Sequence, residues 1–411
     1  MPVLLPQMIT FAPMNKIFQK RSKILVTCAK RISPYLRDEI QQLGYSIDEE
    51  WSTGVAITGT LRDCMRLNMN IRTGNQVMFL LETFKCTNAD ELYRHLYTMA
   101  WEDLIEVDGY LCVTSNVNNP SIDNTMFANV RVKDAIVDRI KEKKGARPNS
   151  GSDRNRTVIH LYWQEDEASV YIDTTGETLV KHNYRKLPGK APMQEGLAAA
   201  TIMASRWDRR SNFVNPMCGS GTLAIEAALL ATNRVPGLLR NNYGFMHIKG
   251  YDEAVYEAEF RSIEEKVNDQ VDFRIVATDN DPRVMEAARV NADIAGVAGM
   301  IEFKECDFLE TDVPQDKGGV VMFNPEYGER LGEYEALELV YKSLGDFMKQ
   351  KCKGYFGYIL TASPNLAKKV GLKATRKLEF YNSKLDCRLL EYELYGGTRR
   401  TDFGPPAGDQ H

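Results

Sequence analysis

The pattern of apolar and polar positions changes near residue 179. Before that point, apolar runs and amphipathic helical spacings follow one another without a regular order, which is typical of α+β units. From Leu179 onward, short apolar runs alternate with helical patterns, and this alternation predicts a doubly wound parallel sheet. The chain is therefore predicted to hold an α/β domain preceded by an α+β region.

The first part of the α+β region is predicted to run strand, helix, strand between residues 23 and 61. Apolar runs at 24–26 and 54–57 predict the strands, and the spacing over 35–43 predicts the helix between them. Gly44 follows that helix directly, at the position where a glycine commonly ends a helix. Nothing in this small unit indicates catalytic chemistry.

The second part of the α+β region, residues 62–178, is predicted to begin with more helix. A strand is expected at 110–113, a long helix at 125–144, and two further strands at 157–163 and 168–174. The polar residues between these elements are expected to form loops.

A local surplus of positive charge accompanies the long helix. The chain carries a formal net charge of −4, which argues against a general nucleic-acid-binding protein. The window 131–156 nevertheless contains nine Lys and Arg residues against four acidic residues. Such a run is either a solvated helix face or a footprint on phosphates, because phosphate contacts supply affinity without sequence choice. The candidate phosphate ligands are Arg131, Lys133, Lys141, Lys144 and Arg147.

A glycine-containing turn opens the sheet of the α/β domain. A strand predicted at 212–214 leads into Asn215-Pro216-Met217-Cys218-Gly219-Ser220-Gly221, and a helix follows. The two glycines permit positive φ, and the N-terminus of the helix favours a negative group. Nicotinamide, flavin and S-adenosylmethionine folds all use such a turn. A third glycine is missing, and the next acidic strand end lies far beyond the roughly 20 residues of a bare nucleotide unit, so a dinucleotide is disfavoured. An insertion at about 234–272 fills that gap.

The next predicted strand ends in an acidic residue. Asp279, followed by Asn280, ends the apolar run 274–277, where a carboxylate can accept both ribose hydroxyls of an adenosine. Capping of the following helix is the alternative role. Asp281 before Pro282 fits that role better than Asp279 does.

A second acidic residue follows the strand predicted at 301–303. Asp307 is placed there to accept the adenine amino group, while Phe308 flanks the ring. Three successive strand ends therefore carry a glycine-containing turn, an acid and an acid.

The fourth strand end carries the polar sequence Asn-Pro-Glu-Tyr. It follows the apolar run 319–323, and ligands of open α/β sheets lie where such buried strands end. The amide oxygen of Asn324 and the backbone carbonyl of Pro325 are placed to accept the two N–H groups of an exocyclic amine on a base. Tyr327 is placed to stack on that base. A structural turn without chemistry is the alternative, but the order of all four strand ends is far more specific than any one of them.

With these motifs the chain resembles the THUMP-domain class I RNA methyltransferases that methylate guanine on its exocyclic nitrogen. It is most similar to the N-terminal half of the bacterial 23S rRNA guanine-N2 methyltransferases, and the resemblance covers about residues 20–397. The segments that carry it are Val132-Lys133-Asp134-Ala135-Ile136-Val137-Asp138, Arg147-Pro148-Asn149, Asn215 to Thr222, Ile225-Glu226-Ala227-Ala228, Asn324 to Arg330 and Leu385-Asp386-Cys387.

The resemblance implies an architecture and a reaction. A Rossmann-like class I S-adenosylmethionine-dependent methyltransferase domain is implied at 179–397, preceded by a ferredoxin-like unit at 23–61 and a THUMP RNA-binding domain at 62–178. An N-terminal extension would cover 1–22 and a disordered tail 398–411. The implied cofactor is S-adenosylmethionine, the implied partner is ribosomal RNA, and the implied product is a guanine methylated on N2.

The resemblance also implies site residues. Asn324, Pro325 and Tyr327 are the expected catalytic residues. Two positions depart from the family pattern: Asn215 stands where an Asp is usual, and Glu326 replaces the second proline of a Pro-Pro pair. Because the amide of Asn324 and the carbonyl of Pro325 remain, activity is expected to be retained. The expected cofactor-binding residues are Asn215, Met217, Cys218, Gly219, Ser220, Gly221, Asp279, Asn280, Asp307, Phe308 and Asn324.

Three other functions stay open on the residues alone. An adenine-N6 methyltransferase uses the same Asn-Pro-x-Tyr pattern for its amine. A non-catalytic RNA-binding factor with an impaired site is suggested by Glu326. A dinucleotide oxidoreductase is the remaining alternative, disfavoured by the missing third glycine.

Composition narrows the class of protein further. No apolar run approaches the roughly 18–20 residues that span a membrane. The eight cysteines are scattered without a C-x-x-C pair and the five histidines do not cluster, which argues against zinc and against a disulfide framework. A reduced, cytoplasmic, metal-free and monomeric protein is expected.

Overall fold

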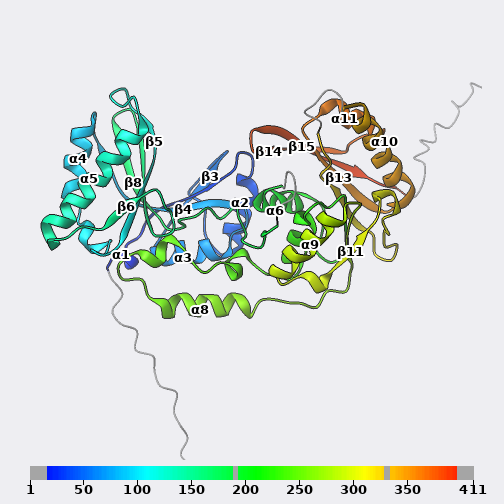
Figure 1. Ribbon diagram of the computed structural model, residues 1–411, viewed down its shortest axis with the longest axis horizontal. Helices are drawn as coiled ribbons and strands as arrows, with labels where there is room; N and C mark the ends of the chain where they lie inside the picture. Colours follow the sequence, from blue (N-terminus) through cyan, green and yellow to red (C-terminus); the bar gives the residue numbers. More distant parts are fainter. Residues whose placement is uncertain (1–15, 188–192, 328–333, 396–411) are drawn as a thin grey trace, which may run out of the picture.

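The computed structural model describes residues 16–187, 193–327 and 334–395 of the 411-residue chain. Two β-sheets lie side by side along the long axis of the molecule, and helix α8 (Glu253–Glu264) runs along the side of the part that holds the first sheet (Figure 1). The first sheet belongs to the α+β region and the second to the α/β domain, so the predicted order of the two fold types is confirmed.

The first sheet has eight strands in the order β2-β3-β1-β4-β8-β7-β5-β6. Strands β1 to β4 pair antiparallel in the βαββαβ arrangement of a ferredoxin-like unit. In the other half, β7 pairs antiparallel with β8 and parallel with β5. The strands are β1 Ser22–Cys28, β2 Glu49–Trp51, β3 Gly54–Gly59, β4 Gly74–Lys85, β5 Tyr110–Asn118, β6 Asn149–Gly151, β7 Thr157–Gln164 and β8 Glu167–Asp173, and the helices are α1 Lys16–Gln19, α2 Ser33–Gln42, α3 Leu61–Asn70, α4 Ala89–Thr98 and α5 Thr125–Lys144.

Strand β4 joins the two halves of this sheet. It pairs with β1 on one side and, from Met78 onward, with β8 on the other, with a register shift between Leu80 and Glu82. The helix expected after residue 62 is present on either side of this strand, as α3 and α4, but the strand itself was not predicted. A compact apolar run such as residues 77–81 suits a buried strand and a buried helix equally well, so the pattern alone does not separate them.

Two expected domain boundaries differ from the observed elements. The ferredoxin-like unit continues past residue 61, because α3 and β4 complete it. The extension expected at 1–22 contains helix α1, and Phe18 of this helix is buried in the core. The remainder of that extension, residues 1–15, and the tail expected at 398–411 lie outside the described residues. A single turn of helix is too short to show a period in sequence, which is why α1 was missed.

The second sheet has seven strands in the order β11-β10-β9-β12-β13-β15-β14. Its first five strands are parallel, so the predicted doubly wound sheet is confirmed for them. Strand β15 pairs antiparallel with both β13 and β14, which closes one edge with a hairpin. The strands are β9 Asn212–Pro216, β10 Ile275–Asp279, β11 Ile301–Glu305, β12 Gly319–Phe323, β13 Tyr355–Thr361, β14 Arg376–Asn382 and β15 Leu385–Glu393.

Helices cover both faces of the second sheet. Phe213 of β9 belongs to one buried apolar cluster together with residues of α7 and α9, whereas its neighbour Val214 belongs to a second cluster together with residues of α10, because successive side chains of a strand point to opposite faces. No helix among the described residues is long and apolar enough to cross a membrane. The helices of this domain are α6 Glu195–Ala204, α7 Thr222–Ala231, α9 Pro282–Ile294, α10 Tyr334–Lys351 and α11 Pro364–Lys369.

The insertion expected at 234–272 connects the second sheet back to the first. Within it, the guanidinium of Arg240 donates hydrogen bonds to three backbone carbonyls of the segment that links the two sheets, among them that of Glu177 at 2.7 Å. The backbone N–H of Lys249 donates to the carbonyl of Leu104 at 2.9 Å. These contacts fix the α+β region against the α/β domain. Besides α8, the insertion holds two short 3-10 helices, η2 Pro236–Leu239 and η3 Gly244–His247.

A buried polar cluster lies where the ferredoxin-like unit meets the α/β domain. Glu226 on α7 lies 2.7 Å from Nδ1 of His182 and accepts a hydrogen bond from the hydroxyl of Tyr184 at 2.9 Å. Nε2 of His182 lies 2.9 Å from the backbone carbonyl of Arg72. A histidine between a carboxylate and a carbonyl donates from both ring nitrogens, so the geometry favours the imidazolium. The second oxygen of Glu226 and one terminal nitrogen of Arg72 are buried without hydrogen-bond partners.

Candidate active site

The glycine-containing turn after β9 has the tight backbone that its sequence predicts. Met217, Gly219 and Gly221 all have positive φ, at 55°, 56° and 83°. Gly221 is the N-cap of α7 and offers no side-chain cap, so the first backbone N–H groups of the helix have no side-chain partner. A methyl group at Gly221 would lie 3.0 Å from Cβ of Ala288, whereas the space beside Gly219 is open. The turn therefore presents backbone donors beside open space, which suits a negative group.

Asp279 lies at the end of β10 and fastens this turn. Its Oδ2 accepts a hydrogen bond from the backbone N–H of Gly219 at 2.9 Å, and its Oδ1 accepts one from that of Asp281 at 3.1 Å. Each oxygen keeps a further lone pair for a ligand. Asp281 caps α9 by accepting from the N–H of Arg283, as the sequence favoured, and Asn280 between the two acids is exposed.

Asp307 and Phe308 follow β11, at the outer edge of the same set of strand ends. Asp307 is exposed, and its Oδ1 accepts a hydrogen bond from the N–H of Leu309 at 2.9 Å. Phe308 is half-buried, and its ring packs edge-on against Phe347 with centroids 6.1 Å apart. The side chain of Asp307 thus reaches solvent, while much of the ring of Phe308 belongs to the core.

The Asn-Pro-Glu-Tyr sequence after β12 forms a turn closed by its own side chains. The hydroxyl of Tyr327 donates to Oδ1 of Asn324 at 2.7 Å. Pro325 is buried and Glu326 is exposed, and the backbone carbonyl of Glu326 lies 3.3 Å from the hydroxyl of Tyr341. Residues 328–330, which complete the motif, lie outside the described residues. The side chain of Glu326 therefore lies at the solvent side of the turn.

Tyr327 packs against the hairpin formed by β14 and β15. The side chains of Asn382 and Cys387 lie beside it. Burial, together with the neighbouring Cys387, raises the pKa of Tyr327 well above its ordinary value. The hydroxyl consequently stays protonated and acts as a donor toward Asn324.

Asn215, at the end of β9, carries an unpaired acceptor into the same region. Its Nδ2 donates to the backbone carbonyl of Met322 at 2.9 Å, which ties the end of β9 to that of β12. Its Oδ1 is buried and has no hydrogen-bond partner among the described residues. A buried acceptor without a partner costs free energy, and a bound donor would remove that cost.

Sheet order brings these residues together. Strand β9 lies between β10 and β12, so the glycine-containing turn has Asp279 on one side and Asn324 on the other. Asp307 follows β11, one strand further out than Asp279. All of them lie at the carboxyl edge of the parallel strands, where open α/β sheets bind ligands.

Three family models match the chain. The RMKL-like methyltransferase domain matches residues 182–391, the RlmL ferredoxin-like domain residues 23–78 and the THUMP domain residues 86–173. The chain belongs to the RMKL-like methyltransferase domain family. The ferredoxin-like match extends to residue 78, in agreement with the strand β4 that completes that unit.

Curated relatives of this RMKL-like chain are similar over most of its length. The ribosomal RNA large subunit methyltransferase K/L of Syntrophotalea carbinolica is 33% identical over 382 residues, which are 90% of this chain and 53% of that protein. The protein of the same name from Pseudomonas paraeruginosa is 32% identical over 381 residues, with the same coverage. The chain thus spans about half the length of the curated relatives it matches.

Solved structures share the whole architecture. SMU.472, a methyltransferase crystallised in complex with SAH, superposes with a TM-score of 0.82 at 27% identity, over 92% of this chain and 100% of that one. A protein from Listeria monocytogenes described as a predicted N6-adenine-specific DNA methylase superposes with a TM-score of 0.82 at 29% identity, over 92% and 97% of the two chains.

The strand ends fit S-adenosylmethionine, the cofactor that this methyltransferase family implies. The buried, unpaired Oδ1 of Asn215 is an acceptor for an ammonium group, and the uncapped N-terminus of α7 suits a carboxylate. The open space at Gly219 leaves room for the ligand beside the backbone, and Asp279 retains acceptor capacity for ribose hydroxyls. Cys218 is half-buried, with its Sγ 3.7 Å from the sulfur of Met285. It therefore shapes the turn more than it offers a polar contact.

Asn291 on α9 is a residue of this region that the sequence analysis missed. It is fully buried, its Nδ2 donates to the carbonyls of Ser220 at 3.3 Å and Leu187 at 3.0 Å, and its Oδ1 accepts from the backbone N–H of Lys186 at 3.0 Å. It thereby clamps the segment before α6 onto the glycine-containing turn. An asparagine among the alanines on the buried face of a predicted helix is the signal that identifies such a residue.

The five candidate phosphate ligands fall into two groups. Arg131 is paired with Asp90 at 2.7 Å, and Lys133 is paired with Asp134. Lys141, Lys144 and Arg147 are exposed at the end of α5 and form no ion pair with another described residue. The three exposed cations are therefore available to bind phosphates. The charges of Arg131 and Lys133 are already neutralised by their acidic partners.

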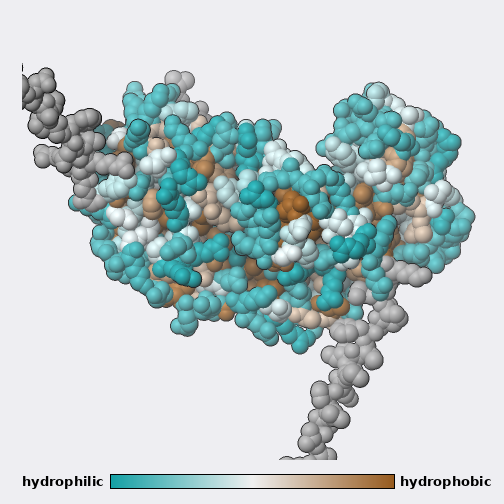
Figure 2. Space-filling view, turned by 180° about the vertical axis from the view of Figure 1, so that it is seen from behind, coloured by the Kyte–Doolittle hydropathy of each residue, from teal (hydrophilic) through white to brown (hydrophobic). Residues whose placement is uncertain are grey.

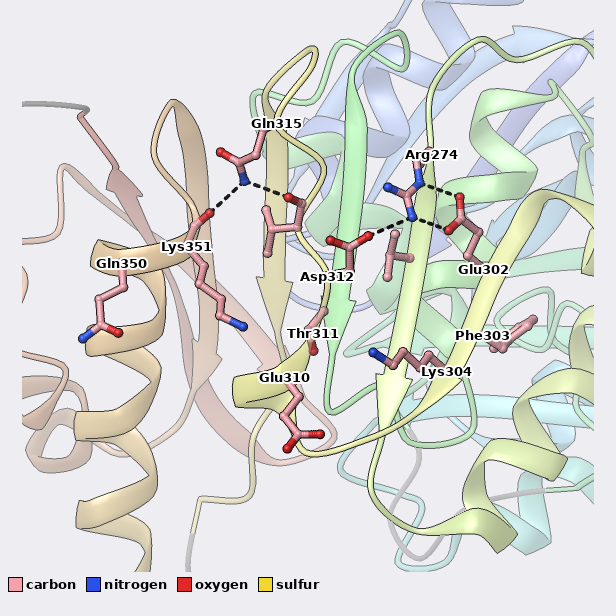
Figure 3. A pocket seen from close by; sticks show the side chains of 12 residues that line it. Arg274, Glu302, Phe303, Lys304, Glu310, Thr311, Asp312, Gln315, Gln350 and Lys351 are labelled. Carbon is pink, nitrogen blue, oxygen red and sulfur yellow. Dashed lines mark hydrogen bonds and ion pairs between the residues drawn. The ribbon is translucent and has the colours of Figure 1, made fainter.

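A cavity of about 680 Å³ lies apart from these strand ends (Figure 3). Arg274, which precedes β10, lines it together with Glu302 and Asp312, and Figure 3 shows both acids paired with the guanidinium. The lining runs from Arg274, before β10, along β11 to the segment 310–315 that follows it. None of Asn215, Asp279, Asp307 and Asn324 lines the cavity, so it is not the candidate active site.

Proposed function

We propose that this chain transfers a methyl group from S-adenosylmethionine to the exocyclic N2 amine of a guanine in 23S rRNA. The observation that carries the proposal is the place of Asn324 and Pro325 at the end of β12, directly beside the glycine-containing turn that follows β9. The names of the curated relatives support ribosomal RNA as the substrate. The THUMP match and the exposed cations at the end of α5 support RNA as the polymer.

The chemistry of this reaction is mainly positioning. The lone pair of an amine on a base is delocalised into the ring, which makes the amine a weak nucleophile. Asn324 and the carbonyl of Pro325 would accept its two N–H groups and thereby turn the lone pair toward the methyl group. S-adenosylmethionine, when bound, supplies that methyl group in activated form, so orientation contributes most of the rate. The methylated amine is acidic and releases its proton without a strong base. The reaction therefore does not require the exposed Glu326 to accept that proton.

Tyr327 has two roles in this proposal. Its hydroxyl now occupies the acceptor that the amine requires, so a bound guanine displaces it. The ring then stacks on the extruded base. Tyr327→Ala is expected to lower kcat/KM about 5- to 150-fold, because one base–aromatic stack contributes about 1–3 kcal/mol. Tyr327→Phe keeps the ring and is expected to stay close to the wild type.

Steady-state kinetics of both variants on the same RNA, with cofactor affinity measured by calorimetry, check this prediction. Cofactor affinity is expected to be unchanged in both. An equal loss of activity in Tyr327→Phe would show that the hydroxyl, and not the ring, is the group that matters.

Two alternatives have a specific observation in their favour. The name of the Listeria monocytogenes protein favours an adenine-N6 methyltransferase, whose amine would use the same two acceptors. The exposed Glu326 in place of the usual proline favours a non-catalytic RNA-binding factor. Action on ribosomal RNA would place the protein in the cytoplasm, and a monomer would suffice, because one chain supplies all four strand ends.

The proposal is tested by offering the 411-residue chain different polymers. The purified chain is incubated with radiolabelled S-adenosylmethionine and, in parallel, undermethylated 23S rRNA, undermethylated 16S rRNA or duplex DNA. We expect label in 23S rRNA alone. Label in DNA would support the adenine-specific alternative, and cofactor binding without label in any polymer would support the RNA-binding factor.

A further inference from the structure

The hairpin β14–β15 touches both the catalytic turn and the ferredoxin-like unit. Its inner face carries the buried residues Phe380 and Cys387, which are direct cross-strand partners. Cys387 lies beside the catalytic Tyr327. Phe380 stacks on Tyr35 of α2, with ring centroids 5.7 Å apart and planes 12° apart. One rigid element therefore links the site to the α+β region.

The outer face of the same hairpin carries charged and aromatic side chains. Glu379 lies opposite Arg388, and Tyr381 lies opposite Asp386. Residues just before α2 extend this face: Nζ of Lys30 lies 4.8 Å from the ring centroid of Tyr381, and Arg31 pairs with Glu379 at 2.9 Å. We call this face the hairpin surface, and it consists of Lys30, Arg31, Glu379, Tyr381, Lys384, Asp386 and Arg388.

The hairpin surface is positive although the chain is acidic. It holds four cations, at 30, 31, 384 and 388, and two acids, at 379 and 386. Lys30 and Lys384 are exposed and form no ion pair with another described residue. Their charges are therefore available to a ligand of opposite sign.

Two residues at or next to the hairpin surface have a positive φ. Arg31 has φ of 72° and Ser383, at the tip of the hairpin, has φ of 57°. Neither is a glycine, and such conformations persist where the surrounding structure holds them and occur preferentially at functional sites.

The hairpin surface lies where the α/β domain meets the ferredoxin-like unit. Figure 1 places β14 and β15 at the edge of the α/β domain nearest to α2 and β3. The outline in Figure 2 is notched between the lobe that carries α4 and α5 and the rest of the molecule, with hydrophilic residues at the rim of the notch and an apolar patch near its base. An RNA bound to the THUMP domain and entering the active site would pass this side.

We propose that the hairpin surface binds the single-stranded RNA that flanks the target nucleotide. Tyr381 stacks on a base next to the extruded one, and Lys30 and Lys384 contact phosphates on either side of it. Because the inner face of the same hairpin holds Tyr327, the register of the RNA and the position of the catalytic turn are set by one element. This inference rests on the proposed RNA substrate.

Four variants of the chain test the hairpin surface. Tyr381→Ala is expected to raise KM for a 23S rRNA fragment about 5- to 150-fold, the range that one base stack contributes, with kcat nearly unchanged. Tyr381→Phe is expected to restore the wild-type KM. The double variant Lys30→Ala/Lys384→Ala is expected to reduce the slope of log affinity against log salt by about two phosphate contacts. Arg261→Ala removes an exposed cation on α8 and serves as the control without effect.

The outcomes separate this inference from the proposed function. If the wild type methylates the fragment but the Tyr381 variant keeps its KM and the lysine variant keeps its salt slope, the hairpin surface does not bind RNA and the proposed function stands. If the wild type methylates no RNA, the proposed function fails. The salt dependence of RNA binding then still shows whether the hairpin surface contacts RNA, because it is measured without turnover.

Discussion

Asn324→Ala is expected to lower the turnover of the methyltransferase at least about 100-fold, the loss typical when one preorganised polar group at a reacting centre is removed. The substitution deletes the amide oxygen that would hold the amine. It leaves the glycine-containing turn and Asp279 untouched, so the dissociation constant of S-adenosylmethionine is expected to stay within about twofold of the wild type. Single-turnover methyl transfer and calorimetric binding of the cofactor on one preparation give both numbers.

A matched control for this variant is Asn365→Ala, which removes an exposed asparagine on α11. It is expected to change neither turnover nor binding. Turnover close to wild type in Asn324→Ala would exclude Asn324 from the chemistry. A parallel loss of cofactor affinity would show instead that Asn324 holds the cofactor or the turn itself.

Glu226→Ala is expected to destabilise the folded chain by about 3–5 kcal/mol, because it leaves the imidazolium of His182 buried without its paired carboxylate. Glu226 is fully buried and lies 2.7 Å from His182. The midpoint of urea unfolding, followed by tryptophan fluorescence, measures the loss. Glu257→Ala on α8 breaks an exposed pair with Arg261 and is expected to cost less than about 0.5 kcal/mol. Equal losses in the two variants would show that the buried cluster stabilises the folded chain no more than an exposed ion pair does.

The same cluster predicts a dependence of stability on pH. Burial opposes the charge of His182, but the carboxylate of Glu226 outweighs it, so the pKa of His182 is raised. A raised pKa contributes stability that is fully present below the unfolded value of roughly 6.5 and is lost as pH rises through the higher folded value. Thermal midpoints from about pH 6 to about pH 9 are expected to fall more steeply for the wild type than for His182→Gln. If the thermal midpoints of the two proteins fall in parallel with pH, His182 is not held as an imidazolium in the folded chain.

The catalytic half of the fold could be predicted from sequence because its strands are short, buried and parallel. Each apolar run ends in a polar residue, and parallel strands place all those ends at one edge. The predicted alternation from β9 to β13 therefore also predicted that Gly219, Asp279 and Asn324 lie together. Strand β4 could not be predicted in this way, because its apolar run fits two kinds of buried element.

The contacts that complete the site were not predictable from periodicity. The hydrogen bond from Tyr327 to Asn324 depends on a side-chain rotamer, and the clamp by Asn291 depends on how α9 packs on the turn. The stacking of Phe380 on Tyr35 joins positions far apart in the chain. Such long-range contacts follow from tertiary packing, which a local pattern does not encode.

The identity of the methylated nucleoside distinguishes guanine from adenine as the substrate of this chain. RNA labelled by the chain with radioactive S-adenosylmethionine is digested to nucleosides and separated by chromatography. The proposed role of Asn324 and Pro325 predicts label in N2-methylguanosine. Label in N6-methyladenosine would contradict the guanine assignment and move the same two acceptors to the amine of adenine.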